Sequence, residues 1–260
     1  MNKSIIVIGL LLVSIFGFSA CTKKPASTGP TPRARKVDKD VNKEPLENRP
    51  FAQLIPRSDA KAVTFNLVSM KKTAKDVEYE IEYESGSLVQ GAFGVIDNLS
   101  KLPVSKEILL GSCSSGGKCT YNTNVTGGTM TLRFGSPDFT LKNEWAFIEK
   151  ASAAKQFTSR DGKFSLDVSK AKNSAGVVIV YQTPGYPGEP GSVIAGPYAV
   201  SVSGTVTGTT SVMLRVGSDV TSGTIMAWDG KTWKELKTTL KDGQAKAEGV
   251  LAQVYVVVKK

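Results

Sequence analysis

Val77-Glu78-Tyr79-Glu80-Ile81-Glu82-Tyr83-Glu84 is the stretch that indicates the fold class, because charged and apolar side chains alternate along it without a break. Successive side chains of a β-strand point to opposite faces, so one face would carry four glutamates and the other an aromatic and aliphatic set. This pattern is typical of a strand that is solvated on one side and buried on the other. The chain is therefore expected to build at least one β-sheet with a single buried face.

Short runs rich in β-branched and aromatic residues lie on both sides of this stretch, and clusters of Gly, Asn, Ser and Pro separate them. We expect strands at 63–68, 77–84, 88–96, 106–110, 129–134 and 139–148, and then at 163–168, 177–182, 198–203, 211–216, 224–228, 232–236 and 253–258. Three Asp-Gly pairs mark tight turns between strands. The spacing predicts an all-β chain that forms antiparallel β-sandwiches.

The strand runs fall into two sets, which predict an Ig-like β-sandwich at 51–150 and a second β-sandwich at 151–260. The boundary is placed at 149–161, where a short helix-prone stretch lacks the large apolar residues that a shared core would need. Each half has about 100 residues, enough for a two-layer core, so we expect the halves to fold independently. The continuous apolar run 254–258 predicts a buried strand that completes the second sandwich.

The N-terminal residues 1–20 have the order of an export signal: Lys3, an uncharged apolar run, and then Ser19 and Ala20 directly before Cys21. This segment resembles a bacterial lipoprotein signal peptide. The resemblance implies that Cys21 is acylated, becomes the first residue of the mature chain, and anchors it to a cell membrane on the extracytoplasmic side. Plain secretion and a retained helix are the alternatives, although about 16 apolar residues fall short of the ~20 that span a bilayer.

Residues 21–50 contain many Pro, Lys and Arg residues and few large apolar ones. Such a composition cannot bury enough surface to order itself, so we expect a disordered tether behind the lipid. Its cations would be attracted to anionic lipid headgroups or wall polymers, unless the segment is only a solvated linker.

Cys113 and Cys119 form an even pair once Cys21 is assigned to the lipid, and they bracket a glycine-containing turn at 114–118. A hairpin there would bring the two sulfur atoms within bonding distance, which predicts a disulfide in an exported protein. A reactive dithiol or a metal pair is the competing interpretation. The spacing is not that of a redox C-x-x-C motif, and no histidine is present to complete a metal site.

Composition excludes several function classes. The chain has 260 residues, a formal net charge of +10 and no histidine, so Ser-His-Asp triads, Cys-His pairs and the usual catalytic zinc sites are ruled out. No glycine-rich phosphate loop is present, and no basic track interleaved with aromatics predicts nucleic-acid binding. We therefore expect no cofactor, no metal, no nucleic-acid partner and no enzymatic activity. The glutamates at 78–84 could suggest calcium binding or a glycan hydrolase, but a solvated strand face is the simpler explanation.

Trp228 and Trp233 flank a tight turn, and Tyr186 lies in the Pro- and Gly-rich segment 184–191, which reads as a surface loop. Exposed aromatics at these positions could stack on sugar rings, which makes the three residues candidate ligand-binding residues. The alternative is that the tryptophans form a cross-strand pair or plug the core.

The sequence from 77–84 through Cys113 and Cys119 to 127–129 resembles an uncharacterised Ig-like module of bacterial surface lipoproteins. The segment 228–233 and the final valine strand are similar to C-terminal β-sandwich modules of bacterial envelope proteins. These resemblances imply a fold but no chemistry. We therefore expect a lipid-anchored, non-enzymatic module that binds an envelope protein or wall polymer. A carbohydrate-binding module is the alternative, and a glycan hydrolase comes third.

Overall fold

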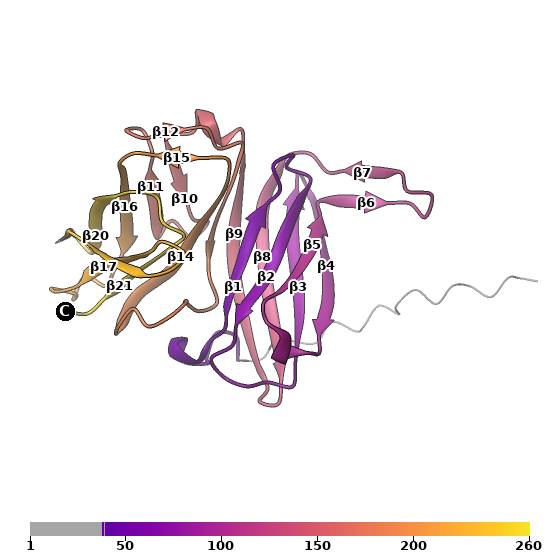
Figure 1. The fold of residues 1–260 in the computed structure, drawn as a ribbon, viewed down its shortest axis with the longest axis horizontal. Coiled ribbons are helices and arrows are strands. Elements are labelled where there is room, and N and C mark those ends of the chain that lie inside the picture. The colour runs from indigo at the N-terminus through magenta and orange to yellow at the C-terminus, as the bar shows by residue number, and fades with distance from the viewer. Residues whose placement is uncertain (1–37, 39) are drawn as a thin grey trace, which may run out of the picture. The chain divides into compact units, whose positions relative to one another are not determined.

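A computed structural model describes residue 38 and residues 40–260 of the chain (Figure 1). The regular structure of these residues consists of β-strands and three short 3-10 helices, η1 (Leu46–Asn48), η2 (Leu99–Lys101) and η3 (Ala151–Ala153). All strand pairs in the sheets are antiparallel. The all-β, antiparallel prediction is thus confirmed.

One nine-stranded sheet forms the framework of the fold. In spatial order its strands are β18 (Trp233–Leu236), β17 (Thr224–Trp228), β21 (Val254–Val258), β14 (Val193–Ser203), β13 (Val177–Gln182), β9 (Phe139–Glu149), β8 (Val125–Gly135), β3 (Asp76–Ser85) and β4 (Leu88–Ile96). We call it the long sheet.

Two smaller sheets accompany the long sheet. The first contains β1 (Phe51–Pro56), β2 (Ala62–Ser69) and β5 (Val104–Leu109), in that spatial order. The second contains β10 (Gln156–Thr158), β11 (Phe164–Asp167), β16 (Thr210–Arg215), β20 (Gln244–Gly249) and β19 (Thr238–Lys241). Two-stranded ribbons form from β6 (Gly111–Cys113) with β7 (Cys119–Tyr121) and from β12 (Lys172–Asn173) with β15 (Val206–Thr207).

Strand β13 shows how the parts fit together, because both of its faces are buried. Val177, Ile179 and Tyr181 belong to one apolar core, whereas Val178 and Val180 belong to another. Alternate side chains of a strand point to opposite faces, so the two cores lie on opposite faces of the long sheet. A strand covered on both sides is expected to be apolar throughout, which explains the sequence Val-Val-Ile-Val-Tyr.

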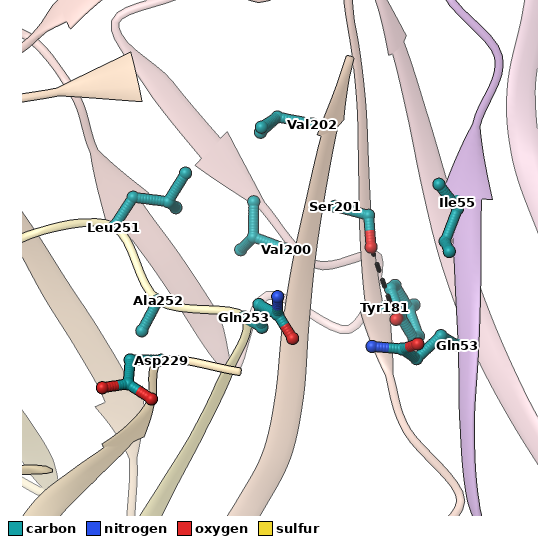
Figure 2. Close-up of a pocket in the computed structure, with 10 residues that line it drawn as sticks. All are labelled: Gln53, Ile55, Tyr181, Val200, Ser201, Val202, Asp229, Leu251, Ala252 and Gln253. Atoms are coloured by element: carbon teal, nitrogen blue, oxygen red, sulfur yellow. Dashed lines mark hydrogen bonds between the residues drawn. The ribbon is translucent and has the colours of Figure 1, made fainter. Parts of the chain in front are cut away.

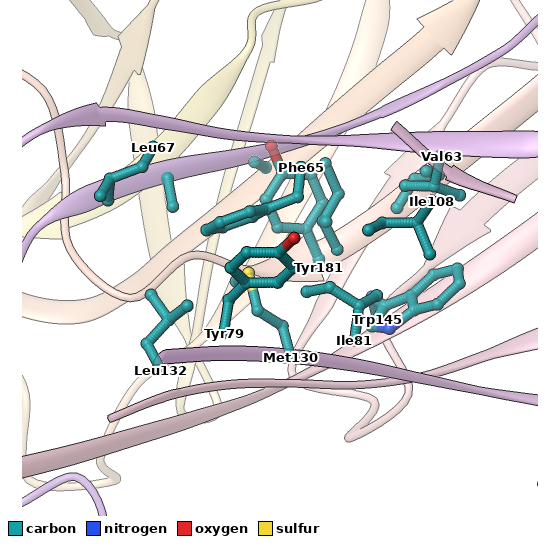
Figure 3. Close-up of a cluster of buried hydrophobic side chains, with 14 of the residues drawn as sticks. Val63, Phe65, Leu67, Tyr79, Ile81, Ile108, Met130, Leu132, Trp145 and Tyr181 are labelled. Atoms are coloured by element: carbon teal, nitrogen blue, oxygen red, sulfur yellow. The ribbon is translucent and has the colours of Figure 1, made fainter. Parts of the chain in front are cut away.

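The first core lies between the long sheet and the β1-β2-β5 sheet (Figure 3). Its aromatic centre includes Phe65 of β2 and Tyr79 of β3, whose ring centroids are 5.3 Å apart, and the fully buried Trp145 of β9. The side chains of Tyr79 and Ile81 point into this core, while Glu80 between them points away from it. The strand face that the alternating sequence predicted as buried is therefore confirmed as buried.

The second core lies between the long sheet and the β10-β11-β16-β20-β19 sheet. Phe164 of β11 is fully buried, and its ring packs at centroid distances of 5.4 Å from Tyr198 and 5.5 Å from Tyr255. Asp161, in the turn before β11, accepts a 2.6 Å hydrogen bond from the hydroxyl of Tyr198. This bond ties the turn of the small sheet to β14 of the long sheet.

The boundary predicted at 149–161 falls in the connection that follows β9, one of the central strands of the long sheet. Strand β9 pairs with β13 from Glu149 opposite Val177 to Trp145 opposite Tyr181. The predicted halves therefore share one hydrogen-bonded sheet, and residues 38–260 form one compact unit. The helix-prone stretch in this connection forms the short helix η3. Independent folding of the two halves stays a prediction, and the sheet that they share argues against it.

Most predicted strands are present, with ends shifted by a few residues, and 254–258 is the buried strand that the sequence predicted. This strand contributes side chains to both cores, because Val254 packs in the first core and Tyr255 and Val257 pack in the second core. The sequence patterns did not predict β1, β10, β12, β15, β19 or β20, which are short or carry polar residues.

The expectation of a tether through residue 50 needs a correction. Val41 forms a parallel bridge with Thr140 of β9, and the side-chain amide of Asn42 exchanges hydrogen bonds of 2.8 and 2.9 Å with the backbone of Lys142. Strand β13 pairs with β9 only from Trp145 onward, so the first residues of β9 have backbone groups left to satisfy. Residues 40–42 satisfy part of them, and this part of the predicted tether is packed on the sheet.

Candidate functional site

The predicted lipid attachment point, Cys21, lies outside the described residues. Within residues 38 and 40–260, none of the helices has the length and apolar character needed to cross a membrane.

Cys113 and Cys119 are joined in a disulfide, with their α-carbons 3.9 Å apart. They face each other as the last pair of the β6–β7 hairpin, and the residues between them are exposed. The predicted disulfide is confirmed, and both thiols are consumed by it. At the hairpin base, the side-chain amide of Asn122 donates to Gln90 at 2.8 Å and to the Tyr83 hydroxyl at 3.0 Å, which fixes the hairpin to β3 and β4.

Two of the three predicted ligand-binding aromatics pack on each other, and the third is buried. Trp228 and Trp233 are directly opposed on β17 and β18, half-buried, with ring centroids 5.5 Å apart. The indole N–H of Trp233 donates a 2.8 Å hydrogen bond to the carbonyl of Pro187. Tyr186 is only 6% exposed, and burial raises the pKa of its hydroxyl. The structure therefore contains the cross-strand tryptophan pair that was expected as the alternative to ligand binding.

The segment 184–191, predicted as a surface loop, covers the tryptophan pair. A Cβ at Gly188 would lie 3.5 Å from both indole rings, and Lys71 donates a 3.1 Å hydrogen bond to the Gly188 carbonyl. Pro184 to Pro187 and Pro190 are buried, whereas Gly188, Glu189 and Gly191 are exposed. The segment therefore packs beside both tryptophan rings, and ligand binding by Trp228, Trp233 and Tyr186 stays a prediction.

The four glutamates of β3, Glu78, Glu80, Glu82 and Glu84, lie on the side of the long sheet that faces away from the first core. We call them the glutamate row. Arg133 of β8 donates to Glu80 at 2.8 Å, Arg160 donates to Glu84 at 2.9 Å, and Thr129 donates to Glu82 at 2.9 Å. These contacts mark a hydrogen-bonded surface and not a pair of acids converging in a cleft. No group of three metal-binding side chains gathers anywhere in residues 38 and 40–260.

Strand β4 is the most unusual surface of the described chain. Among residues 38 and 40–260 it pairs only with β3, and it forms one end of the long sheet. Val89 is 66% exposed, Phe93 64% and Val95 49%, and all three lie on the same face as the glutamate row. We call these three residues the apolar stripe. Exposed apolar residues are common singly, but a line of three on one strand is a candidate contact surface.

The free edge of β4 also offers backbone groups. Ser85 and Leu88 flank a two-residue turn whose first residue, Gly86, has a φ of 58°. In such hairpins the flanking residues are a hydrogen-bonded pair, and the pairing then alternates along the strands. The N–H and C=O groups of Val89, Phe93 and Val95 therefore point away from β3, where another strand could pair with them.

A groove of about 420 Å³ lies beside the free edge of β1 (Figure 2). Gln53 and Ile55 of β1, Tyr181, Ser201 of β14, Asp229 and Gln253 are among its lining residues. The hydroxyls of Tyr181 and Ser201, two of these lining residues, are 3.5 Å apart (Figure 2).

Two titratable groups of this groove have shifted pKa values. Burial raises the pKa of Tyr181 to about 12, and backbone hydrogen bonds from Thr232 and Lys231 lower the pKa of Asp229. Near neutral pH the Tyr181 hydroxyl is therefore protonated and the Asp229 carboxyl is ionised.

The sequence analysis proposed Trp228, Trp233 and Tyr186 as binding residues. It predicted the strand at 88–96 but did not identify it as a contact surface. Its segment, Leu88 to Ile96, is apolar on both faces, which is typical of a strand buried on both sides. Nothing in it signals exposure, because exposure follows from its position at the end of the sheet.

Comparison with known proteins gives no match for this chain among family models, curated proteins or solved structures.

Proposed function

We propose that this chain is a non-enzymatic interaction module of a cell envelope, held at the extracytoplasmic side of a membrane by a lipid on Cys21. The order of residues 1–21 supports the anchor. The single structural observation that supports an interaction role is the apolar stripe on the edge strand β4.

The character of β4 supports protein–protein contact. Natural proteins blunt edge strands with charged residues, proline, bulges or a covering segment. Strand β4 has nine residues, contains no charge and no proline, and pairs with β3 without a register shift. An edge left in this state is suited to receive a strand from an envelope protein, with backbone hydrogen bonds providing affinity and the stripe providing apolar contact.

We further propose that the two cores correspond to the two Ig-like sandwiches expected from the sequence, fused through a common sheet. The three-stranded sheet would complete one sandwich and the five-stranded sheet the other. The placement of the two cores on opposite faces of β13 supports this arrangement.

The alternative of a carbohydrate-binding module needs accessible aromatic rings. The packing of Trp228 against Trp233, and the burial of Tyr186, weaken it. A wall polymer therefore ranks below a protein as the proposed partner.

Capture from envelope extracts tests the contact surface. Immobilised protein should retain a partner, and Phe93→Lys should abolish that binding because it places a charge in the apolar stripe. The matched control is Val250→Lys, which replaces a 70% exposed valine outside β4. Equal binding by Phe93→Lys and the native chain would remove β4 from the proposal.

Membrane fractionation tests the anchor separately. Cys21→Ser should move the protein to the soluble fraction. If that variant still sediments with membranes at high salt, the lipid anchor is wrong, whatever the capture experiment shows.

A further inference from the structure

Strand β4 has a sequence that reads almost the same in both directions. From Val89 to Val95 it is Val-Gln-Gly-Ala-Phe-Gly-Val, which is centred on Ala92 and begins and ends with the same residue. Two identical strands that pair in antiparallel orientation meet in reversed order. The edge of β4 is therefore close to complementary to the edge of a second β4.

The backbone groups of β4 restrict how two such strands can pair. Every second residue has its N–H and C=O groups pointing away from β3, namely Val89, Gly91, Phe93 and Val95. An antiparallel pair centred on Ala92 places these outward residues of one copy opposite the outward residues of the other. The four facing pairs exchange two hydrogen bonds each, which makes about eight bonds. A shift by one residue would oppose outward groups to groups already bonded to β3.

The same register also matches the exposed side chains. Val89 lies opposite Val95 of the second copy, and Phe93 lies opposite Gly91, which has no side chain to block the ring. A pair centred on Phe93 would instead place Val89 opposite the exposed Asp97. A pair centred on Gly91 would place Val95 opposite a residue of the turn. The first register is therefore the one that covers the whole apolar stripe.

The area of this contact agrees with a weak dimer. A free valine side chain exposes about 100 Å² and a free phenylalanine side chain about 200 Å². Because Val89, Phe93 and Val95 are 66%, 64% and 49% exposed, the stripe offers roughly 250 Å² of apolar side chain per copy. The backbone edges add to this, and the total lies at the low end of specific interfaces, below ~1,200 Å², where association is weak and reversible.

The charges of the sheet do not oppose the contact. Strand β4 itself contains no charged residue. Two copies of β4 would separate the glutamate rows by three strand spacings, or about 14 Å. This distance exceeds the Debye length of about 8 Å at physiological ionic strength, so the repulsion between the rows is largely screened. An uncharged edge thus meets a matching uncharged edge.

Pairing through β4 ends at two copies. Each copy has one β4, and the strand at the other end of the long sheet, β18, has only four residues and carries the exposed Lys234 and Glu235. Short, charged edge strands resist pairing. A two-fold contact uses the same surface on both copies and therefore closes, so a dimer forms and not a filament.

The hairpin β6–β7 extends on the side of the molecule where β4 lies (Figure 1). It is fixed near the beginning of β4, because Asn122 at its base donates to Gln90. A two-fold axis at Ala92 reverses the strand direction, so the hairpins of the two copies lie at opposite ends of the paired strands. They therefore do not meet.

We propose that two copies of this chain pair through β4 in antiparallel orientation, with a two-fold axis at Ala92, and join their long sheets into one continuous sheet. The occupant of the free edge is thus a second copy of the chain. This inference rests on the contact role proposed for β4 and names its partner. It does not depend on the lipid anchor.

Disulfide crosslinking of cysteine variants tests the register. The background is the full chain with Cys21→Ser, purified in detergent, whose other two cysteines are joined to each other. In the dimer the two Ala92 residues face each other with α-carbons about 4.5 Å apart, which a disulfide can bridge. The matched control is Val95→Cys, which is more exposed on the same strand, but its two copies lie about 20 Å apart along the strands. Under mild oxidation, Ala92→Cys should give about tenfold more covalent dimer than Val95→Cys.

A proline tests the backbone contact in the Ala92→Cys background. The N–H of Val95 points away from β3, so Val95→Pro keeps the β3–β4 ladder and the melting temperature. It should lower the dimer yield about tenfold, because it removes an outward donor and its ring obstructs the second strand. Val95→Thr keeps the N–H and the branched shape, and should stay close to the background yield.

Two results would overturn the self-pairing. One is an Ala92→Cys yield no higher than that of Val95→Cys at about 100 µM protein, a concentration at which weak dimers form. The other is an equal yield from Val95→Pro and Val95→Thr. If either occurs while capture from envelope extracts still depends on Phe93, the partner of β4 is a different protein and the contact role stands. If capture also fails, the contact role is wrong as well.

Discussion

Truncation of Phe164 to alanine should destabilise both cores, although its side chain lies in only one of them. The ring is fully buried and packs against Tyr198 and Tyr255. Removing a buried phenylalanine costs about 4 kcal/mol, from lost burial and from the cavity that remains. Those two tyrosines belong to β14 and β21 of the long sheet, whose other face carries Ala199 and Val254 of the first core. The loss should therefore reach the first core.

Urea unfolding followed by two probes measures this coupling. Far-ultraviolet circular dichroism reports on all strands, and fluorescence of Trp145 reports on the first core once Trp228 and Trp233 are replaced by phenylalanine. With an m-value of about 2.5 kcal/mol per molar urea, Phe164→Ala should lower both midpoints together by roughly 1.5 M. The replacement of the two tryptophans serves as the common background, so its own cost cancels.

The opposite result would support the two-domain expectation from the sequence. If the Trp145 midpoint stays at its original value while circular dichroism becomes biphasic, the halves unfold separately and the shared sheet does not couple them. The reciprocal variant Phe65→Ala, in the first core, controls for an effect peculiar to Phe164. It should likewise give one transition.

Three further predictions concern single contacts. Replacing both hairpin cysteines by serine should destabilise the hairpin by about 2 kcal/mol, which would be measured as faster hydrogen exchange at residues 111–121. The urea midpoint for unfolding of the two cores should stay unchanged. A large drop of that midpoint would contradict the exposed placement of the hairpin. Burial opposes ionisation of Asp161, but hydrogen bonds from Ser159, from Tyr198 and from the backbone outweigh it and lower its pKa. The ionised Asp161 therefore stabilises the fold at pH values above the unfolded pKa of about 3.9, and this stabilisation is lost as pH falls through the folded pKa. Asp161→Asn should make the free energy of unfolding fall less steeply with acid. An unchanged dependence on acid would count against this hydrogen-bond network. Trp233→Phe should cost about 1 kcal/mol through the lost hydrogen bond to the 184–191 segment, and an unaltered melting temperature would show that the bond contributes nothing.

The local parts of the fold could be predicted from sequence. The alternation in 77–84 indicated which side chains of β3 are buried, because a two-residue period has only one way to place an apolar face on a core. The cysteine spacing likewise predicted the disulfide. Both features depend on residues close together in the chain.

The parts that were missed depend on distant residues. The long sheet joins β9 to β13 and β14 to β21, and no local pattern reveals that pairing. The segment 184–191 has the composition of a surface loop, yet tertiary packing buries most of it against the tryptophan pair. Asn42 lies in a basic, Pro-rich stretch and still pairs with β9, because that strand extends past its neighbour.

The proposed interaction role is tested most directly by site-specific photo-crosslinking in intact cells. A photoreactive amino acid at position 93 lies in the apolar stripe, and one at position 250 lies on an equally exposed apolar site outside β4. If β4 is the contact surface, position 93 should give a discrete crosslinked product containing an envelope protein, and position 250 should not. Identical patterns from the two positions, or no product at position 93, would contradict the account.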